Sequence, residues 1–291
     1  MVVRIGILGT DNSHSIGYSQ FFNNKQGKDY IPGAKVVAIY GLEDKRNKEV
    51  AEKGMVPTIV RRPTDMIGMI DGAIVDFRHG HRHLKYAAPL IKAGIPTFID
   101  KPFASSVADA KKMIALSKKY RTPITTFSSL RFGAGVERFK KDVAKLKHVR
   151  SVVTLGPGNA RDQYDGIFFY AVHQVEFILE VFGNDVVAAR GVDYDGMLVA
   201  AVRYKNGLIA TMHEINLGWT PFKAISAGEE GNAEYDYKAA EDGFVIAART
   251  ALKMFKTGTM PYSYKDMIVS TRVLAAIAKS MKLGGKEVAI R

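Results

Sequence analysis

The first turn of the chain has the residue types of a nucleotide-binding loop. An apolar run from Val2 to Leu8 is followed by a glycine turn and then by a helical segment. A strand–turn–helix unit of this kind binds pyrophosphate because the first amides of the helix are free donors and the helix start carries partial positive charge. The residues that would line this site are Gly6, Gly9, Thr10, Asp11, Asn12, Ser13 and His14.

Two of the usual loop glycines are replaced in this chain. The three glycine positions of the G-x-G-x-x-G frame fall on Gly9, Asp11 and His14. A carboxylate at Asp11, about 5 Å from a phosphate charge, would repel it by about 3 kcal/mol at an effective dielectric of roughly 20. The repulsion falls if Asp11 turns away to cap the helix, with Asn12 and Ser13 as rival caps, and if His14 donates to a phosphate oxygen. The alternative is an N-cap cluster without a ligand; we predict that the loop still binds a nucleotide.

The end of the second expected strand bears on the choice between NAD and NADP. Glu43 and Asp44 follow the strand at 35–40 and could accept from the adenosine ribose hydroxyl. Lys45 and Arg46 could instead favour a 2′-phosphate, and a plain polar helix start explains the same residues. The sequence leaves the choice open.

A basic turn with alternating histidines follows the third long strand. Three histidines at such spacing suggest a metal site. No carboxylate lies within the turn itself, and basic neighbours repel cations, so we expect no metal. We expect Arg78 or His79 to reach a cofactor phosphate or an acidic substrate, and we count His83 among the cofactor-binding residues. The turn contains Arg78, His79, His81, Arg82 and His83.

The elements that must position these residues alternate along the first half of the chain. Strands are expected at 2–8, 35–40, 72–77, 95–99 and 123–127, and helices at 15–22, 45–53, 83–93 and 106–120. Strands that alternate with helices over short connections predict a parallel sheet with right-handed crossovers. The fold class is therefore α/β, with a Rossmann, doubly wound domain at the N-terminus.

The alternation of strands and helices ends at about residue 124. Strands are expected at 151–155, 197–204, 208–215 and 222–227, with a hairpin turn at Lys205-Asn206-Gly207. A long helix begins with the capping pattern Ser263 to Asp266 and ends at Gly284. We therefore expect a Rossmann dinucleotide-binding domain at 1–123 and an α+β domain with a mainly antiparallel sheet at 124–291.

Three segments narrow the class of protein. They are Asp-Lys-Pro-Phe-Ala at 100–104, Gly-Ile-Phe-Phe-Tyr-Ala-Val-His-Gln-Val-Glu at 166–176, and Phe-Lys-Thr-Gly at 255–258. In this order the chain resembles the Gfo/Idh/MocA family of NAD(P)-dependent oxidoreductases over nearly its whole length. The resemblance implies NAD or NADP as cofactor, a small-molecule substrate held between a Rossmann domain and an open-faced sheet domain, and homodimers or homotetramers built on the open sheet face.

The resemblance also implies roles for individual residues. Lys101 matches the lysine of the family's Glu-Lys-Pro motif, with Asp100 in place of Glu, and would exchange a proton with the substrate hydroxyl beside the nicotinamide. Pro102 fixes that turn and its peptide bond could be cis. His173 matches the second-domain histidine. Phe169 stands where the family often has Asp, and Tyr170 is expected to supply the missing polar contact. The implied reaction is hydride transfer between nicotinamide and a carbinol of a sugar, cyclitol or related compound.

Composition limits the other function classes. The chain of 291 residues has 47% hydrophobic residues, no cysteine and a net charge of +13. The absence of cysteine fits a reducing compartment, and with no signal peptide and no long apolar run we expect a cytoplasmic protein. Nucleic acid is disfavoured as a partner because no aromatic residues interleave with the basic helices. A redox-neutral NAD-using enzyme such as a glycosidase, and a ligand-binding or regulatory protein on a degenerate Rossmann scaffold, remain as alternatives.

Overall fold

The computed structural model describes residues 2–218, 220–237 and 242–290 and contains two compact units. Unit 1 comprises Met1–Phe127 and Val245–Met267; unit 2 comprises Ser128–Phe244 and Ile268–Arg291. The sequence predicts a single boundary after residue 123. In the structure the division follows Phe127, and a segment from late in the chain returns to unit 1.

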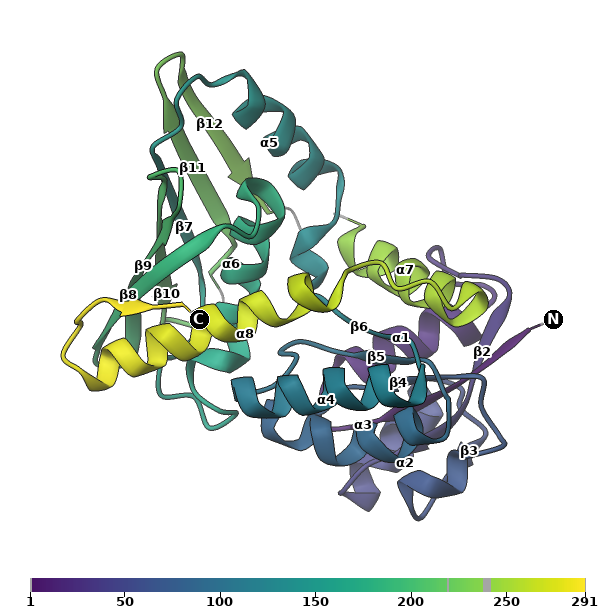
Figure 1. Cartoon of the computed structure of the whole chain (residues 1–291). Helices are drawn as coiled ribbons and strands as arrows, with labels where there is room; N and C mark the ends of the chain where they lie inside the picture. Colours follow the sequence, from purple (N-terminus) through teal and green to yellow (C-terminus); the bar gives the residue numbers. More distant parts are fainter. Residues whose placement is uncertain (1, 219, 238–241, 291) are drawn as a thin grey trace. The chain divides into compact units, whose positions relative to one another are not determined.

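Unit 1 is built on a six-stranded sheet in the order β3-β2-β1-β4-β5-β6 (Figure 1). Every strand pair in it is parallel. The strands are β1 (Val3–Leu8), β2 (Ala34–Tyr40), β3 (Thr58–Ile59), β4 (Gly72–Val75), β5 (Thr97–Ile99) and β6 (Ile124–Thr126). The order reverses between β1 and β4, where a doubly wound sheet opens a crevice at its carboxyl edge.

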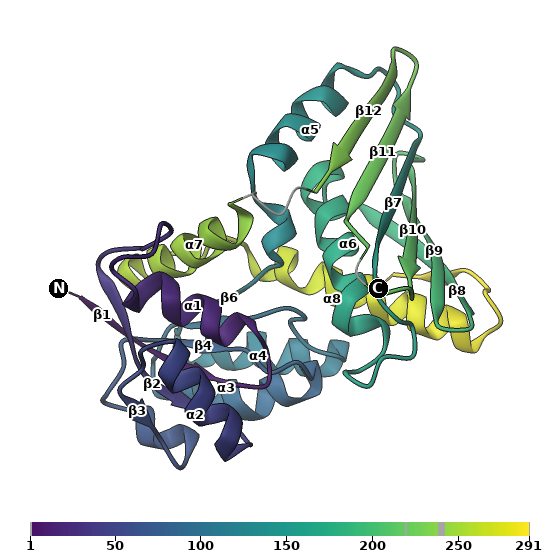
Figure 2. The same cartoon turned by 180° about the vertical axis from the view of Figure 1, so that it is seen from behind.

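Helices cover both faces of this sheet (Figures 1 and 2). On one face lie α1 (His14–Asn23) and α2 (Asp44–Lys53), and on the other α3 (His83–Lys92) and α4 (Val107–Tyr120). Short 3-10 turns are η1 (Pro63–Met66) and η2 (Gly80–Arg82), and α7 (Gly243–Thr257) is the late helix. The predicted Rossmann domain is therefore confirmed, and the sequence analysis missed β3 and α7.

Local sequence signals fix several helix ends. Ser106 accepts from the Asp109 amide at 3.1 Å at the start of α4, and Ser263 and Asp266 bond each other at the start of α8 (Tyr264–Lys282). These are the capping patterns expected from the sequence. The phenyl ring of Phe255 on α7 packs so closely on Gly72 that a Cβ there would lie 2.6 Å from it. Glycine at that position therefore lets α7 dock on β4.

Unit 2 is built on a seven-stranded mixed sheet in the order β12-β11-β7-β10-β9-β8-β13. The strands are β7 (Ser151–Pro157), β8 (Val186–Tyr194), β9 (Met197–Tyr204), β10 (Ile209–Ile215), β11 (Lys223–Gly228), β12 (Gly231–Asp236) and β13 (Val288–Ala289). Only β7 and β10 pair in parallel. The predicted α+β domain is confirmed, and β8, β12 and β13 are strands that the sequence analysis did not anticipate.

One face of the second sheet is packed against helices. The helical elements of unit 2 are η3 (Ser129–Arg131), α5 (Ala134–Lys145), α6 (Ile167–Phe182) and most of α8. Alternate residues of β10, such as Ala210 and Met212, are buried under these helices. The opposite face has no helix in the described part of unit 2 (Figures 1 and 2).

Candidate active site

The dinucleotide loop of unit 1 begins with a glycine that no other residue could replace without strain. Gly9 has φ +110°, and a Cβ there would lie 2.5 Å from the backbone nitrogen of Phe77. Its positive φ and this close approach explain why the first glycine of the motif persists. Gly6 lies within β1 and faces Met66 and Ile70, so its role is packing of the sheet.

Asp11 turns away from the start of α1. Its Oδ2 accepts from the backbone N–H of Arg78 at 3.3 Å, while Oδ1 is buried with no hydrogen-bond partner. Ser13 is the N-cap residue but makes no side-chain cap, and the first turn of α1 contains no acidic residue. The expected cap by Asp11 is not formed; Asn12 instead accepts from the His14 amide at 3.3 Å. The helix start therefore keeps its positive end free of acidic side chains.

The guanidinium group of Arg46 supports the loop through hydrogen bonds. Arg46 of α2 donates from Nε to the Thr10 carbonyl at 2.7 Å and from a terminal nitrogen to the Asn12 carbonyl at 3.2 Å. It also pairs with Glu49 at 2.6 Å. The Thr10 hydroxyl bonds Asn47 at 2.7 Å and is buried. The positive charge of Arg46 thus lies on the loop itself.

Glu43 and Asp44 lie where the ribose-binding acid was expected. Glu43 is the N-cap residue of α2, Asp44 is its first residue, and both side chains are exposed. Neither makes a side-chain cap. Both carboxylates are therefore positioned at the carboxyl end of β2 and accessible to a ligand.

A buried polar cluster lies behind the loop. Asp76 and Asp100 directly follow the neighbouring strands β4 and β5, and both are buried. His14 Nδ1 lies 3.0 Å from Asp100 Oδ2, and the Tyr18 hydroxyl donates to Asp100 Oδ1 at 3.1 Å. Asn12 donates to Asp76 Oδ1 at 2.9 Å. The residue that replaces the third loop glycine thus contacts the residue before Lys101.

The charges of this cluster shift one another. Burial raises the pKa of Asp76 well above its usual value, and the Asp100 charge raises it further. Burial alone would raise the pKa of Asp100, but His14 and Lys101 outweigh it and hold that pKa at about 2. Burial lowers the pKa of Lys101, although both carboxylates oppose the shift. Lys101 is thus an amine whose proton is easier to remove than that of an exposed lysine.

The cluster does not lead us to assign a metal. Donor atoms of His14, Asp76 and Asp100 lie within 4.8 Å of one another, a spacing that a divalent cation could use. The ammonium of Lys101 interacts with both carboxylates and already supplies positive charge there. A second cation beside it would be repelled.

The basic turn separates into surface and core residues. The rings of His79 and His81 lie 4.9 Å apart, and His81 is exposed. His83 is fully buried; its Nε2 lies 2.8 Å from the Phe77 carbonyl and its Nδ1 3.4 Å from the Phe103 carbonyl. Burial lowers the pKa of His83. With both ring nitrogens on backbone carbonyls, His83 is suited to holding the two turns together rather than to touching a cofactor.

The remaining predicted residues of unit 1 form the turn after β5. The Lys101–Pro102 peptide bond is cis, as the sequence analysis allowed. Lys101 is buried at the end of β5, and Gly80 lies against Pro102, where a Cβ would come within 2.7 Å. The turn therefore packs tightly on the histidine turn and holds Lys101 in a fixed environment.

In unit 2, His173 is held by a serine that the sequence analysis missed. The Ser128 hydroxyl lies 2.6 Å from His173 Nδ1, and both side chains are buried. The rings of Tyr170 and His173 lie 5.7 Å apart on one face of α6. Phe169 instead packs on Tyr164, with ring centroids 4.9 Å apart. His173 therefore has a fixed ring orientation without the acid that is frequent in the family.

A buried ion network supports this pair. Arg131 of η3 bonds Glu176 through Nε and Glu180 at 3.0 Å, and Lys140 pairs with Glu180 at 2.9 Å. Because Glu176 and Glu180 belong to α6, the network ties η3 to the helix that carries His173. It thereby places Ser128, which precedes η3, beside the histidine.

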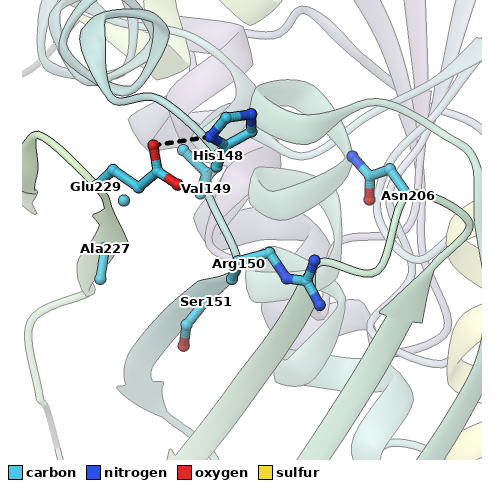
Figure 3. Close-up of a pocket in the computed structure, with 8 residues that line it drawn as sticks. His148, Val149, Arg150, Ser151, Asn206, Ala227 and Glu229 are labelled. Carbon is cyan, nitrogen blue, oxygen red and sulfur yellow. Dashed lines mark ion pairs between the residues drawn. The ribbon is translucent and has the colours of Figure 1, made fainter.

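A large hollow on the surface of unit 2 lies apart from these residues. It has a volume of about 850 Å³ and opens at one end of the second sheet (Figure 3). His148 pairs with Glu229 across it at 2.8 Å. The hollow is lined by His148, Val149, Arg150, Ser151, Asn206, Ala227, Gly228 and Glu229. None of the predicted site residues lines it, so we do not assign the site to this hollow.

Fold and site define a two-domain protein with a Rossmann unit and an open-faced mixed sheet. The family model described as an oxidoreductase family with an NAD-binding Rossmann fold matches residues 3–126. The match covers the Rossmann unit and links that part of the chain to the Gfo/Idh/MocA family. The predicted family and its NAD-binding class of domain are thereby confirmed.

Individual relatives agree with this assignment. The chain is 25% identical to an uncharacterized oxidoreductase, YhhX, of Escherichia coli over 55% of the chain and 51% of that protein. It is 31% identical to inositol 2-dehydrogenase 1 of Saccharopolyspora erythraea over 40% of the chain and 33% of that protein. The chain thus spans about half of the first of these curated relatives and about a third of the second. The fold matches a myo-inositol dehydrogenase from Lactobacillus casei, solved with NAD(H) and myo-inositol, with a TM-score of 0.82, 15% identity and coverage of 100% and 97%.

Proposed function

We propose that the protein is an NAD(P)-dependent oxidoreductase that transfers hydride between nicotinamide and a carbinol of a sugar, cyclitol or related hydroxylated compound. The observation that carries the proposal is a buried lysine, Lys101, at the carboxyl edge of a Rossmann sheet beside the dinucleotide loop. Burial lowers the pKa of Lys101, as a proton-transferring lysine requires. The named relatives that act on inositol support the cyclitol class.

The loop residues fit a dinucleotide despite the missing glycines. Gly9 permits the turn, the start of α1 has no acidic residue in its first turn, and Asp11 is held on the Arg78 amide. Arg46 adds a positive charge on the loop. Residues Gly9 to His14 would hold the diphosphate, and the bound cofactor would accept or donate the hydride.

The chain's own residues would move the proton and orient the substrate. Lys101 in its amine form would take the hydroxyl proton as the carbonyl forms, and return it in the reverse direction. His173, with its Nδ1 engaged by Ser128, would present Nε2 to a substrate hydroxyl, and Tyr170 would add a polar contact. Arg78 would contribute positive charge, and His79 a polar contact, toward an anionic group of the cofactor.

We favour NAD over NADP. Arg46 is the cation best placed to meet a 2′-phosphate, but its donors are engaged by two loop carbonyls and by Glu49. Glu43 and Asp44 are exposed at the carboxyl end of β2 and would repel that phosphate while accepting from a ribose hydroxyl. NADH is therefore expected to bind more tightly than NADPH.

The open face of the second sheet would carry the oligomer contact. Val153 and Ile225 are exposed on it, at 38% and 48%, and His213 and Leu155 are half-buried. An apolar sheet face of this kind is typical of a surface that another protein covers. We propose a homodimer or homotetramer formed through this face, with unit 2 also binding the substrate.

We place the protein in the cytoplasm, in keeping with its lack of cysteine. No helix in the described ranges is long and apolar enough to cross a membrane.

Titration with NADH and NADPH, followed by fluorescence, tests the cofactor. Binding near micromolar supports the enzyme, and no binding at millimolar concentration supports the second candidate, a binding or regulatory protein on a degenerate Rossmann scaffold. Asp11 at a glycine position, with one oxygen buried and unpartnered, favours that second candidate.

Replacement of Lys101 tests the catalytic assignment. Lys101→Ala should abolish turnover of a polyol or cyclitol with NAD while the dissociation constant for NADH changes little, because the side chain acts on the hydroxyl proton. Arg82→Ala, in a neighbouring turn, is the matched control for loss of a basic side chain. Retained turnover in the Lys101 variant would remove the lysine from the mechanism.

A further inference from the structure

Two acidic side chains meet in the interior of unit 1. Asp76 and Asp100 end adjacent parallel strands, and the side chain of neither is exposed beyond 2%. One carboxylate oxygen of each and one ring nitrogen of His14 lie within 4.8 Å of one another. Two buried like charges at this separation cannot both remain ionised at acceptable cost.

The hydrogen bonds show which carboxylate oxygen of the pair lacks a donor. The oxygens of Asp100 have donors in Tyr18 and an interaction with His14, and Oδ1 of Asp76 has a donor in Asn12. Oδ2 of Asp76 is buried without a donor. An ionised buried oxygen left unpaired costs several kcal/mol, whereas a proton on Asp76 would make it a donor to the Asp100 carboxylate.

We propose that Asp76 and Asp100 share one proton, and that this pair, with His14 as its exit to water, is the proton acceptor that serves Lys101. The role of Lys101 in this statement rests on the proposed function, while the shared proton does not. His14 suits the exit because its side chain is 23% exposed, whereas both carboxylates are enclosed.

Most charged groups around the pair favour one proton on Asp76, although Lys101 lowers the pKa of Asp76 as well as that of Asp100. Asp100 and Asp11 favour a proton on Asp76, and His14, Lys101 and His83 favour the ionised form of Asp100. The titratable and charged groups facing the pair are Asp11, His14, Tyr18, Arg78, His83 and Lys101. The pKa values of the two acids are thereby driven apart, as in a carboxyl pair that holds one proton.

The proton balance of the reaction closes through this pair. In the oxidation direction the carbinol C–H bond breaks, the hydride leaves with two electrons for the cofactor, and the O–H proton passes to the Lys101 amine. Lys101 then gives this proton to the ionised member of the pair. One proton leaves the pair through His14 to water, so that the amine and the singly protonated pair are both restored.

The shared proton can be tested on the full chain without cofactor. In NMR spectra of protein labelled with ¹³Cγ-aspartate at neutral pH, one aspartate should show the shift of a neutral acid. That resonance should disappear in Asp76→Asn and persist in the surface control Asp195→Asn, whose side chain is 97% exposed. If every aspartate shows the carboxylate shift, the pair holds no proton and the proposal is wrong.

The link to the cofactor can be tested by calorimetry. NAD⁺ and NADH differ in the positive charge on the ring, so in buffers of different ionisation enthalpy NAD⁺ binding should release more protons than NADH binding. We expect this difference to be lost in Asp76→Asn. If that variant keeps the difference and Lys101→Met loses it, the proton belongs to Lys101 alone and the pair is not its acceptor. If neither nucleotide binds, the proposed function fails while the NMR result stands.

The exit is tested separately through His14. His14→Gln should lower the turnover rate and raise its solvent isotope effect, and added imidazole should restore much of the loss. Tyr18→Phe, which also removes a contact to Asp100 but carries no titrating proton at neutral pH, should not respond to imidazole. An unchanged turnover rate in the His14 variant would show that the proton does not leave the pair through His14.

Discussion

The two units bury their charges in opposite ways. In unit 2, Arg131 lies between Glu176 and Glu180, and Lys140 also pairs with Glu180, so that opposite charges lie together. In unit 1, Asp76 and Asp100 place two acidic groups together beside Lys101. Because both carboxylates are buried, one of them is expected to hold a proton. The first arrangement is suited to a structural role, and the second is suited to proton transfer, because perturbed pKa values cluster at functional sites.

Glu214 provides a third case between these two. It lies on β10 with both carboxylate oxygens buried and no hydrogen bond of normal geometry. Burial raises the pKa of Glu214 well above its usual value, and Asp162 adds to the shift. Like Asp76 it should be a neutral acid, but Asp162 is the one acidic group among the causes of its shift, and no lysine is among them.

The largest effect is expected from breaking the neutralised network. Arg131→Met leaves Glu176 buried without its cation and should lower the free energy of unfolding by about 3–5 kcal/mol. Urea denaturation measures the loss. Lys140→Met removes only a half-exposed contact to Glu180 and should cost less than about 1 kcal/mol. Equal losses in the two variants would contradict a central role for Arg131.

A smaller effect separates the isolated acid from the paired one. The pKa of Glu214 is raised in the folded protein, so its contribution to stability is fully present below the unfolded pKa of 4.5 and is lost as pH rises toward the folded pKa. Each pH unit in this window should cost up to about 1.4 kcal/mol, and Glu214→Gln should remove that slope. Unfolding by urea at a series of pH values measures it.

The control for this prediction is a group whose contribution to stability changes with pH in the opposite direction. Arg203 lowers the pKa of Glu287, so the stability from that exposed ion pair is present above the unfolded pKa and is lost as pH falls. Glu287→Gln should therefore leave the slope at neutral pH unchanged. A wild-type protein whose stability does not fall with rising pH would refute the neutral form of Glu214.

The smallest effect concerns the support of His173. Ser128→Ala removes the partner of Nδ1, a hydrogen bond worth about 0.5–1.5 kcal/mol, so turnover should fall by up to about tenfold. Ser129→Ala is the neighbouring control. Nitrogen NMR of histidine should show a changed Nδ1 environment in the first variant only; an unaltered signal there would separate Ser128 from His173.

Much of unit 1 was predictable because its signals are local. The apolar runs, the cap at Ser106 and the turn at Gly9 act over a few residues, and they gave the alternation of strands and helices correctly. The capping pattern Ser263 to Asp266 likewise located α8. The two replaced glycines were visible as an anomaly, but not what their side chains touch.

The site depended on contacts that no local signal contains. His14 meets Asp100 across 86 residues of chain, and Ser128 meets His173 across 45. Asp76 was passed over in the sequence because a single acid after a strand has many ordinary explanations. Its position at the end of β4 beside β5 was the available hint, since carboxyl ends of neighbouring parallel strands share an edge.

The sequence alone determined the order and type of most elements, the Rossmann class and the position of Lys101, because periodicity and capping are short-range properties of the chain. Tertiary structure decided that β7 pairs with β10 in parallel, that Val245–Met267 joins unit 1, and that Asp76 faces Asp100. These facts follow from how sheets assemble and helices dock, which brings together residues far apart in sequence and removes water from between them. The protonation of the acids is set by that burial and therefore has no signature in the residue types themselves.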